Sequence, residues 1–212
     1  MVYIITDDHD TNTINSFNYF GRYMEFLWKL YLKLEGWKAV NEFPNHLKKA
    51  VAIIGPHTYW KDFTIGLAAR SVLKIKYGKY LGKAELFRGP FGFLFRWLGG
   101  TPVDRFSKQG VVEQVVEKFN KAENLVIALS PEGTRKKVNK LRTGFYHIAK
   151  KANIPIVMVG LDYSKKELSV SEPFYTTDDE AADFRKIIEF FAPLKGYYPD
   201  QGFGHLLEEH EH

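Results

Sequence analysis

The stretch AVAIIGPHTYWKDFTIGLAARS, residues 50–71, carries the pattern on which the fold prediction depends. Residues 50–55 form an apolar run typical of a buried strand, and Pro56 then interrupts the run. Residues 61–71 are rich in Ala, Leu and Ile, which indicates a helix. His57 and Asp62 lie at the break between the two elements. The sequence therefore predicts a strand, a turn that carries an imidazole and a carboxylate, and a helix.

Strand and helix patterns alternate along the rest of the chain. We predict further strands at residues 72–76, 124–130 and 154–163, and an edge strand at 166–175. We predict helices at residues 109–122, 143–152 and 178–192, and a helix-like aromatic segment at 83–105. Thr177 and Glu180 have the spacing of a capping box for the last helix. This alternation predicts an α/β fold with a mostly parallel central sheet flanked by helices.

The chain is expected to form one α/β domain over residues 44–200, preceded by an amphipathic helical segment at 1–43 and followed by a solvated tail at 201–212. Hydrophobic residues make up 45% of the sequence, which is enough for a sizeable core. Residues 17–36 predict a helix with a wide aromatic face and a narrow polar stripe. Such a helix lies in a membrane interface or packs on the core, and the sequence favours neither.

Composition excludes several classes of site and protein. The chain has no cysteine, so it has no disulfide and no thiolate zinc site. It contains no apolar run of membrane-spanning length, and its acidic N-terminal region predicts no secretory signal. The net charge of +5 favours an anionic partner such as a membrane surface, a phosphorylated substrate or nucleic acid. Nucleic acid is the least supported, because the basic residues flank apolar aromatic patches rather than a stacking platform.

Three polar clusters, PHTYWKD, GTPVDR and SPEGTR, stand at the ends of predicted strands or, for GTPVDR, of a strand-like element. Ligands of open α/β sheets bind beyond the carboxyl ends of the strands, so these clusters are candidate site residues. In the first turn of its helix, Asp62 can accept a hydrogen bond from Nδ1 of His57, which leaves Nε2 free to act as a general base. The alternative is a helix-capping carboxylate beside an incidental histidine.

The other two clusters supply groups for an anion. The guanidinium of Arg135 suits a phosphate, and Gly133 permits the close backbone approach that a tight turn needs. The alternative is a solvated turn with an ion pair between Glu132 and Arg135. Taken alone, GTPVDR favours a structural pair of Asp104 and Arg105. The clusters together indicate a phosphorylated substrate with a free hydroxyl and an apolar tail, and no nucleotide-binding glycine loop or zinc-binding histidine pair is present.

The sequence resembles the glycerophospholipid acyltransferase family, typified by 1-acylglycerol-3-phosphate acyltransferases. The four blocks of that family stand in order as HTYWKD (57–62), GGTPVDR (99–105), SPEGTR (130–135) and IPIVMV (154–159). The resemblance spans roughly residues 45–175. It departs from the family pattern at Pro56, Tyr59 and Ser130, where the family often has Asn, Ser and Phe.

The resemblance implies an O-acyltransferase that moves a fatty acyl group from acyl-CoA or acyl carrier protein to lysophosphatidic acid, giving phosphatidic acid. It implies that His57 deprotonates the acceptor hydroxyl and that Asp62 orients His57. It implies that the acceptor is held by Arg105, Glu132, Gly133, Thr134 and Arg135. No metal and no cofactor besides the donor is implied. The enzyme would be peripheral, on the cytoplasmic side of an anionic membrane.

Two alternatives remain at this stage. One is the same chemistry on another lysolipid, such as a lyso-ornithine lipid. The other is a non-catalytic lipid-binding module on the same scaffold. Retention of both Arg105 and Arg135 favours a phosphate-bearing acceptor. The paired His57 and Asp62 favour an enzyme, because lipid binding alone needs no base.

Overall fold

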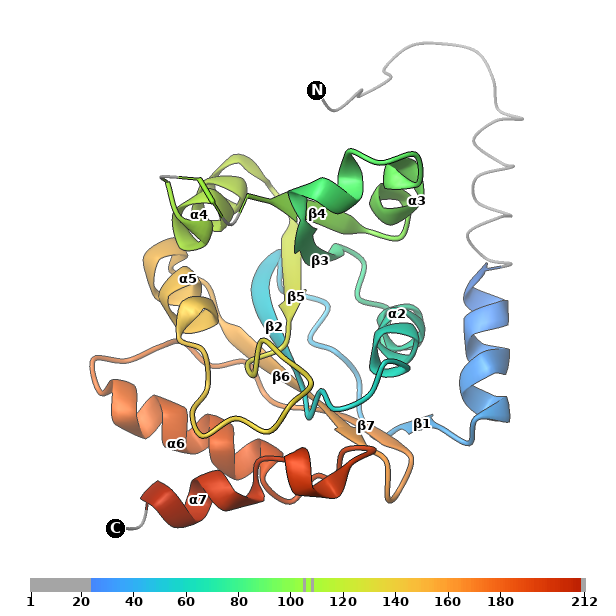
Figure 1. Cartoon of the computed structure of the whole chain (residues 1–212), viewed down its shortest axis with the longest axis vertical. Helices are drawn as coiled ribbons and strands as arrows, with labels where there is room; N and C mark the ends of the chain where they lie inside the picture. Colours follow the sequence, from blue (N-terminus) through green and yellow to red (C-terminus); the bar gives the residue numbers. More distant parts are fainter. Residues whose placement is uncertain (1–23, 105, 108, 211–212) are drawn as a thin grey trace.

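The computed structural model describes residues 24–104, 106–107 and 109–210. Its centre is a seven-stranded sheet with the order β1-β7-β6-β2-β5-β3-β4 (Figure 1). The strands are β1 Lys38–Ala39, β2 Lys49–Gly55, β3 Gly78–Lys83, β4 Gly100–Val103, β5 Leu125–Leu129, β6 Ile156–Asp162 and β7 Glu167–Val170. Among these seven strands of the described chain, only β6 and β7 pair antiparallel, and all other neighbouring strands are parallel. The predicted α/β fold with a mostly parallel sheet is confirmed.

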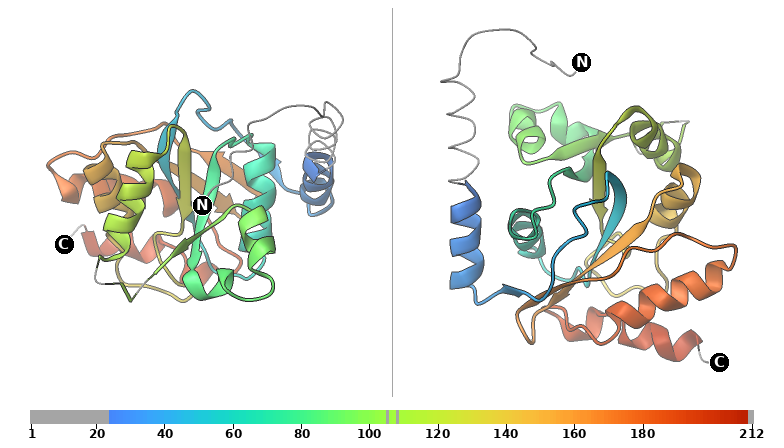
Figure 2. Two further views of the ribbon diagram at one scale, coloured as in Figure 1. Left: turned by 90° about the horizontal axis from the view of Figure 1, so that it is seen from above. Right: turned by 180° about the vertical axis from the view of Figure 1, so that it is seen from behind.

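Helices cover both faces of the sheet (Figures 1 and 2). The α-helices are α2 Asp62–Val72, α3 Gly92–Trp97, α4 Val111–Lys121, α5 Gly144–Ala152, α6 Glu180–Phe191 and α7 Gly204–His210. Residues 24–34 form one more helix, and Ala84–Phe87 and Pro199–Gln201 are short 3₁₀ turns. α2 lies on one face with the 24–34 helix outside it, while α4, α5 and α6 lie on the other face.

β2 contributes to a separate core on each face of the sheet, because successive side chains of a strand point in opposite directions. Val51 and Ile53 join the cluster beneath α4, α5 and α6. Ala50 and Ala52 join the cluster beneath α2. Two of the side chains that β2 presents to α2 are therefore small, and Ile54, on the same face, is the larger third.

The predicted strand at 72–76 is wrong. α2 continues to Val72, and the strand in this part of the chain is β3, six residues later than predicted. Lys74 adopts a left-handed backbone with φ of 55°, which ends the helix. Leu73 and Ile75 then pack on the core as the apolar residues of a helix end. Their alternation with lysines imitates the pattern of a strand.

The aromatic segment at 83–105 contains a 3₁₀ turn, the short helix α3 and strand β4, rather than one helix. Gly92 begins α3, and a Cβ there would lie 2.3 Å from the carbonyl oxygen of Phe87. Gly99 follows α3 with φ of +93°, a backbone conformation that favours glycine. The glycines therefore mark the turns between short elements.

Two predictions in the C-terminal half of the chain are wrong: the edge strand at 166–175 and the capping box at Thr177. β7 is second from the edge of the sheet, because the two-residue strand β1 pairs with it. The N-cap of α6 is Asp179, whose Oδ1 accepts the N–H of Ala182 at 2.9 Å, and Thr177 is not the cap. The N–H of Thr177 donates to buried Asp183 at 2.6 Å, which holds Thr177 outside the helix.

The expected solvated tail from residue 201 onward is also wrong. Phe203 and Leu206 are buried in the core, and the ring of Phe203 stacks on Phe191 with centroids 4.9 Å apart. A Cβ on Gly55, at the end of β2, would lie 3.2 Å from the ring of Phe203. The domain therefore extends at least to Leu206.

The 24–34 helix packs on the domain through one side only. Leu32 is buried, and the hydroxyls of Tyr31 and Thr64 lie 3.1 Å apart, which links this helix to α2. Phe26 and Leu34 are 60% and 79% exposed. The part of the helix expected at 17–23 lies outside the described residues.

Candidate active site

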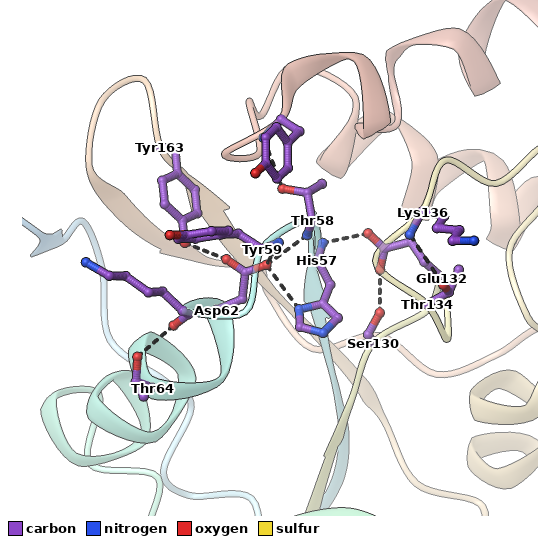
Figure 3. Close-up of polar contacts among 12 residues, drawn as sticks. His57, Thr58, Tyr59, Asp62, Thr64, Ser130, Glu132, Thr134, Lys136 and Tyr163 are labelled. Atoms are coloured by element: carbon purple, nitrogen blue, oxygen red, sulfur yellow. Dashed lines mark hydrogen bonds and ion pairs between the residues drawn. The ribbon is translucent and has the colours of Figure 1, made fainter.

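Residues that follow three adjacent strands meet at the carboxyl ends of those strands (Figure 3). β2 lies between β5 and β6, and the three strands are parallel, so their carboxyl ends are neighbours. His57 follows β2, Glu132 follows β5, and Tyr163 follows β6 directly. The site therefore lies where ligands of parallel sheets are generally bound.

The imidazole of His57 and the carboxylate of Asp62 are in contact, as their spacing predicts. Nδ1 of His57 lies 3.1 Å from Oδ2 of Asp62. The same Oδ2 accepts the N–H groups of Thr58 at 2.8 Å and Tyr59 at 2.7 Å, so the turn itself holds the carboxylate. The Asp62 side chain is 1% exposed and that of His57 is 26% exposed. Since Nδ1 faces Asp62, Nε2 is the nitrogen available to a substrate.

Tyr163 completes the environment of Asp62, and sequence reasoning missed it. Its hydroxyl donates to Oδ1 of Asp62 at 2.5 Å, across 101 positions of sequence. Burial, together with the hydrogen bond to Asp62, raises the pKa of the Tyr163 phenol. The phenol therefore stays protonated and remains a donor. Its place at the end of a predicted strand was the available signal, but no spacing rule connects that place with residue 62.

Glu132 is buried, with both carboxylate oxygens bonded to other residues of the protein, and its role in holding the acceptor stays a prediction. The residue is 2% exposed. Its Oε1 accepts the backbone N–H of His57 at 2.7 Å, and its Oε2 accepts the hydroxyl of Ser130 at 2.5 Å. Burial raises the pKa of the carboxyl. Among the described residues it makes no ion pair with Arg135, so the solvated ion-pair alternative is wrong.

We expect Glu132→Gln to leave kcat/KM within about threefold of wild type. The glutamine oxygen can still accept the N–H of His57 and its amide can donate to Ser130, whereas Glu132→Ala leaves a buried donor unpaired at a cost of about 1–3 kcal/mol. Burial raises the folded-state pKa of Glu132 above its ordinary value of 4.5. Wild type therefore loses stability as the pH rises from about 4.5 through the folded-state pKa.

Denaturant unfolding at pH 4.5 and pH 7.5, with acyl-transfer kinetics, measures these effects. The free energy of unfolding of Glu132→Gln minus that of wild type is expected to be larger at pH 7.5 than at pH 4.5. A rise of more than tenfold in the acceptor KM of a stably folded Glu132→Gln protein would instead support the acceptor-binding role.

Gly133, Thr134 and Arg135 continue the turn beside the site, and Gly133 and Arg135 are exposed. Gly133 has φ of 67°, in the left-handed region that favours glycine. Oγ1 of Thr134 accepts the N–H of Lys136 at 3.3 Å, within the turn. Arg135 is exposed, and its side chain lines the cavity described below. The turn thus presents a guanidinium at the mouth of the site.

Arg105 lies outside the described residues. β4, which precedes it, is three strands from β2 in the sheet, a separation of about 14 Å at ordinary strand spacing. Oδ1 of Asp104 accepts the N–H of Phe106 at 2.9 Å. The carboxyl end of β4 therefore lies on the same side of the sheet as that of β2, farther from His57 than the SPEGTR turn.

A cavity of about 510 Å³ extends from the site between α2 and the sheet. His57, Asp62, Ser130 and Arg135 line its polar part, and most of its other walls are apolar. Its volume is within the range of pockets that hold small organic ligands, about 300–1,000 Å³.

Small residues make room for this cavity. Ala52 of β2 and Ala128 of β5 are register partners, and both line it. Gly66 of α2 also lines it, and a Cβ on Gly66 would meet no atom within 4 Å. Arg70, eight residues after Asp62 and so about 12 Å along the helix, lines the cavity farther from the site. Its Nη1 donates to the carbonyl of Leu98 at 2.8 Å, and burial lowers its pKa.

Within residues 24–104, 106–107 and 109–210, no helix is long and apolar enough to cross a membrane. The same part of the chain has no group of three or more His, Asp or Glu side chains that could hold a metal ion.

The fold and the site define an α/β protein with a histidine–carboxylate pair at the mouth of an apolar cavity. A protein-family model described as Acyltransferase matches residues 36–162, more than half of the chain, so the chain belongs to the acyltransferase family. This match includes the turns that carry His57 and Glu132. It confirms the predicted family, and the chain is an acyltransferase.

A solved structure supports the same fold. The crystal structure of the 1-acyl-sn-glycerophosphate (LPA) acyltransferase PlsC from Thermotoga maritima matches with a TM-score of 0.55 and 18% sequence identity. The match covers 85% of this chain and 80% of that one. Likeness at this identity shows a shared architecture. No curated protein matches the chain.

Proposed function

We propose that this acyltransferase moves a fatty acyl group from the thioester of acyl-CoA or acyl carrier protein to the hydroxyl of lysophosphatidic acid. The observation that carries the proposal is the His57–Asp62 pair at the mouth of a largely apolar cavity, beside the exposed guanidinium of Arg135. A base, an apolar pocket and a cation match the hydroxyl, the acyl chain and the phosphate of that reaction.

In this mechanism Nε2 of His57 takes the proton of the acceptor hydroxyl while its oxygen attacks the thioester carbonyl carbon. The tetrahedral intermediate then collapses, the carbon–sulfur bond breaks, and the leaving thiolate takes the proton from the imidazolium. The two products are phosphatidic acid, which is the new ester, and the free thiol. Asp62 stabilises the imidazolium between the two steps.

The acceptor phosphate is assigned to Arg135 and to the backbone of Gly133 and Thr134 in the same turn. The resemblance to the family adds Arg105 to this set. Glu132 has a different role, because its oxygens hold the turns of His57 and Ser130. The similar solved structure is that of an enzyme for the same acceptor, which supports this choice over an amino-acid lysolipid.

The proposal includes a peripheral position on an anionic membrane, on its cytoplasmic side. Apolar side chains are exposed on two segments: Phe26 and Leu34 of the 24–34 helix, and Phe93 and Trp97 of α3, the last two 70% and 53% exposed. Both segments lie on the side of the sheet toward α2 (Figure 1). Exposed aromatic residues and a net charge of +5 suit an anionic lipid surface.

The test is an assay of the full chain with palmitoyl-CoA and lysophosphatidic acid in anionic vesicles, with thiol release, lipid product and co-sedimentation measured together. We expect equal amounts of thiol and phosphatidic acid, and protein in the vesicle pellet. Thiol release with lyso-ornithine lipid but not with lysophosphatidic acid would replace the acceptor. Binding to vesicles without transfer to any acceptor would favour a lipid-binding module.

We expect Gly66→Leu to shift the preferred acyl chain toward shorter lengths. The new side chain would enter the open space of the cavity, and leucine is a better helix former than glycine by about 0.8 kcal/mol, so the fold is retained. The measurement is kcat/KM for C8, C12 and C16 acyl donors, with Gly144→Leu on α5, which also has no atom near its Cβ, as the matched control. An unchanged chain-length profile would show that the acyl chain lies elsewhere.

A further inference from the structure

We propose that Tyr163 is a positioning residue for acyl transfer, whose hydroxyl holds the Asp62 carboxylate in the orientation that presents Oδ2 to His57. This inference rests on the proposed function, because it assigns Tyr163 a role through the general base. It adds a third side chain to the pair that the sequence motif contains.

The hydrogen bonds of Asp62 are divided unequally between its two oxygens. Oδ2 faces the N–H groups of Thr58 and Tyr59 as well as Nδ1 of His57. Oδ1 accepts only the hydroxyl of Tyr163 among the described residues. Rotation about the bond to a carboxyl carbon is soft, so a partner on each oxygen is what holds the plane of the group. The carboxylate is 1% exposed, and water is therefore poorly placed to replace the phenol.

The phenol is itself fixed by its surroundings. The backbone N–H of Tyr163 donates to the carbonyl of Lys195 at 2.8 Å. Its ring packs edge-on against Trp37, with centroids 4.9 Å apart, and against Tyr197 at 5.5 Å. The ammonium of Lys166 lies 5.2 Å from the ring centroid. These contacts come from outside α2, so Tyr163 provides a reference point that is independent of the helix carrying Asp62.

The chemistry of a phenol suits this role. It donates a hydrogen bond without adding a positive charge, so the carboxylate keeps its full charge for the imidazolium that forms during transfer. Its raised pKa keeps it protonated at the pH of the reaction. A lysine at this place would instead neutralise Asp62 and compete with His57.

The test compares wild type, Tyr163→Phe and Tyr31→Phe in the vesicle assay. Tyr163→Phe retains the ring and its packing, and we expect kcat to fall about 10–100-fold, the effect of losing a hydrogen bond to a charged group, with both KM values within about twofold. Tyr31→Phe removes another phenol that bonds to α2, at Thr64, and is expected to leave kcat within about twofold. An equal loss of kcat in both variants would show that Tyr163 only holds helix α2 in place and does not position the Asp62 carboxylate.

A second readout needs no substrate. In protein with ¹⁵N-labelled histidine, His57→Ala identifies the Nδ1 resonance of His57 among the seven histidines. We expect a hydrogen-bonded Nδ1–H signal in wild type and in Tyr31→Phe, and its broadening or upfield shift in Tyr163→Phe. An unchanged signal together with unchanged kcat would overturn the inference. If wild type fails to acylate lysophosphatidic acid, the proposed function fails, while the resonance still decides whether Tyr163 positions the pair.

Discussion

His57→Ala is expected to lower kcat for acyl transfer by about 10²–10⁴-fold, the usual contribution of a positioned general base. The imidazole is the group whose Nε2 is available at the cavity mouth, while its Nδ1 lies 3.1 Å from Asp62. KM values should change little, because the imidazole acts on the hydroxyl proton as the transition state forms. Initial rates of thiol release at saturating donor and acceptor measure the effect.

His147→Ala is the matched control, because His147 is an exposed histidine on α5, on the opposite side of the sheet. It should retain the wild-type rate. Thermal unfolding of both variants separates a loss of chemistry from a loss of fold. A folded His57→Ala protein with more than a tenth of the wild-type kcat would show that the hydroxyl loses its proton to another group.

The local part of this site could be predicted from the sequence. The apolar run, the break at Pro56 and the following helix imply a strand, a turn and a helix, and the turn places His57 close to Asp62. This contact depends on five residues of chain, whose geometry is set by local rules. The order of the four family blocks then indicates which strands carry polar ends.

The long-range part of the site could not be predicted in the same way. Glu132 reaches His57 across 75 positions, and Tyr163 reaches Asp62 across 101. Both contacts exist because β5 and β6 are the two neighbours of β2. Strand order is decided by the packing of the whole sheet, and it cannot be predicted from the spacing of residues along the chain. The direction of the Glu132 side chain, toward the backbone N–H of His57, follows from the same packing.

The wrong predictions at 72–76 and 201–212 have a common physical cause. In both segments a few apolar residues pack at the end of an element, where periodicity is too short to show the type of structure. Leu73 and Ile75 pack behind a helix end, and Phe203 fills the space left by the missing side chain of Gly55. Packing of this kind depends on partners distant in sequence.

Asp62→Asn is the second change with a large expected effect, a loss of about a hundredfold in kcat. The N–H groups of Thr58 and Tyr59 both point at Oδ2, so the amide oxygen is expected to take that place and the amide nitrogen to face Tyr163. Nδ1 of His57 then still meets an oxygen. What is lost is the negative charge that stabilises the imidazolium; hydrogen bonds to charged groups contribute about 1.5–3 kcal/mol, against about 0.5–1.5 kcal/mol for neutral ones.

Asp183→Asn provides a matched control within the same chain. Asp183 is also buried and accepts a tyrosine hydroxyl, that of Tyr146, at 3.0 Å, and a backbone N–H, that of Thr177, at 2.6 Å. It lies in α6, on the face of the sheet away from α2, and no histidine of the described residues is among its hydrogen-bond partners. Burial, with the bond to Asp183, raises the pKa of the Tyr146 phenol to about 12, and the pKa of the Tyr163 phenol is raised in the same way.

Asp183→Asn should therefore lower the free energy of unfolding without lowering kcat, whereas Asp62→Asn should lower kcat in a folded protein. Equal kcat values for the two variants would show that the charge of Asp62 has no part in the reaction.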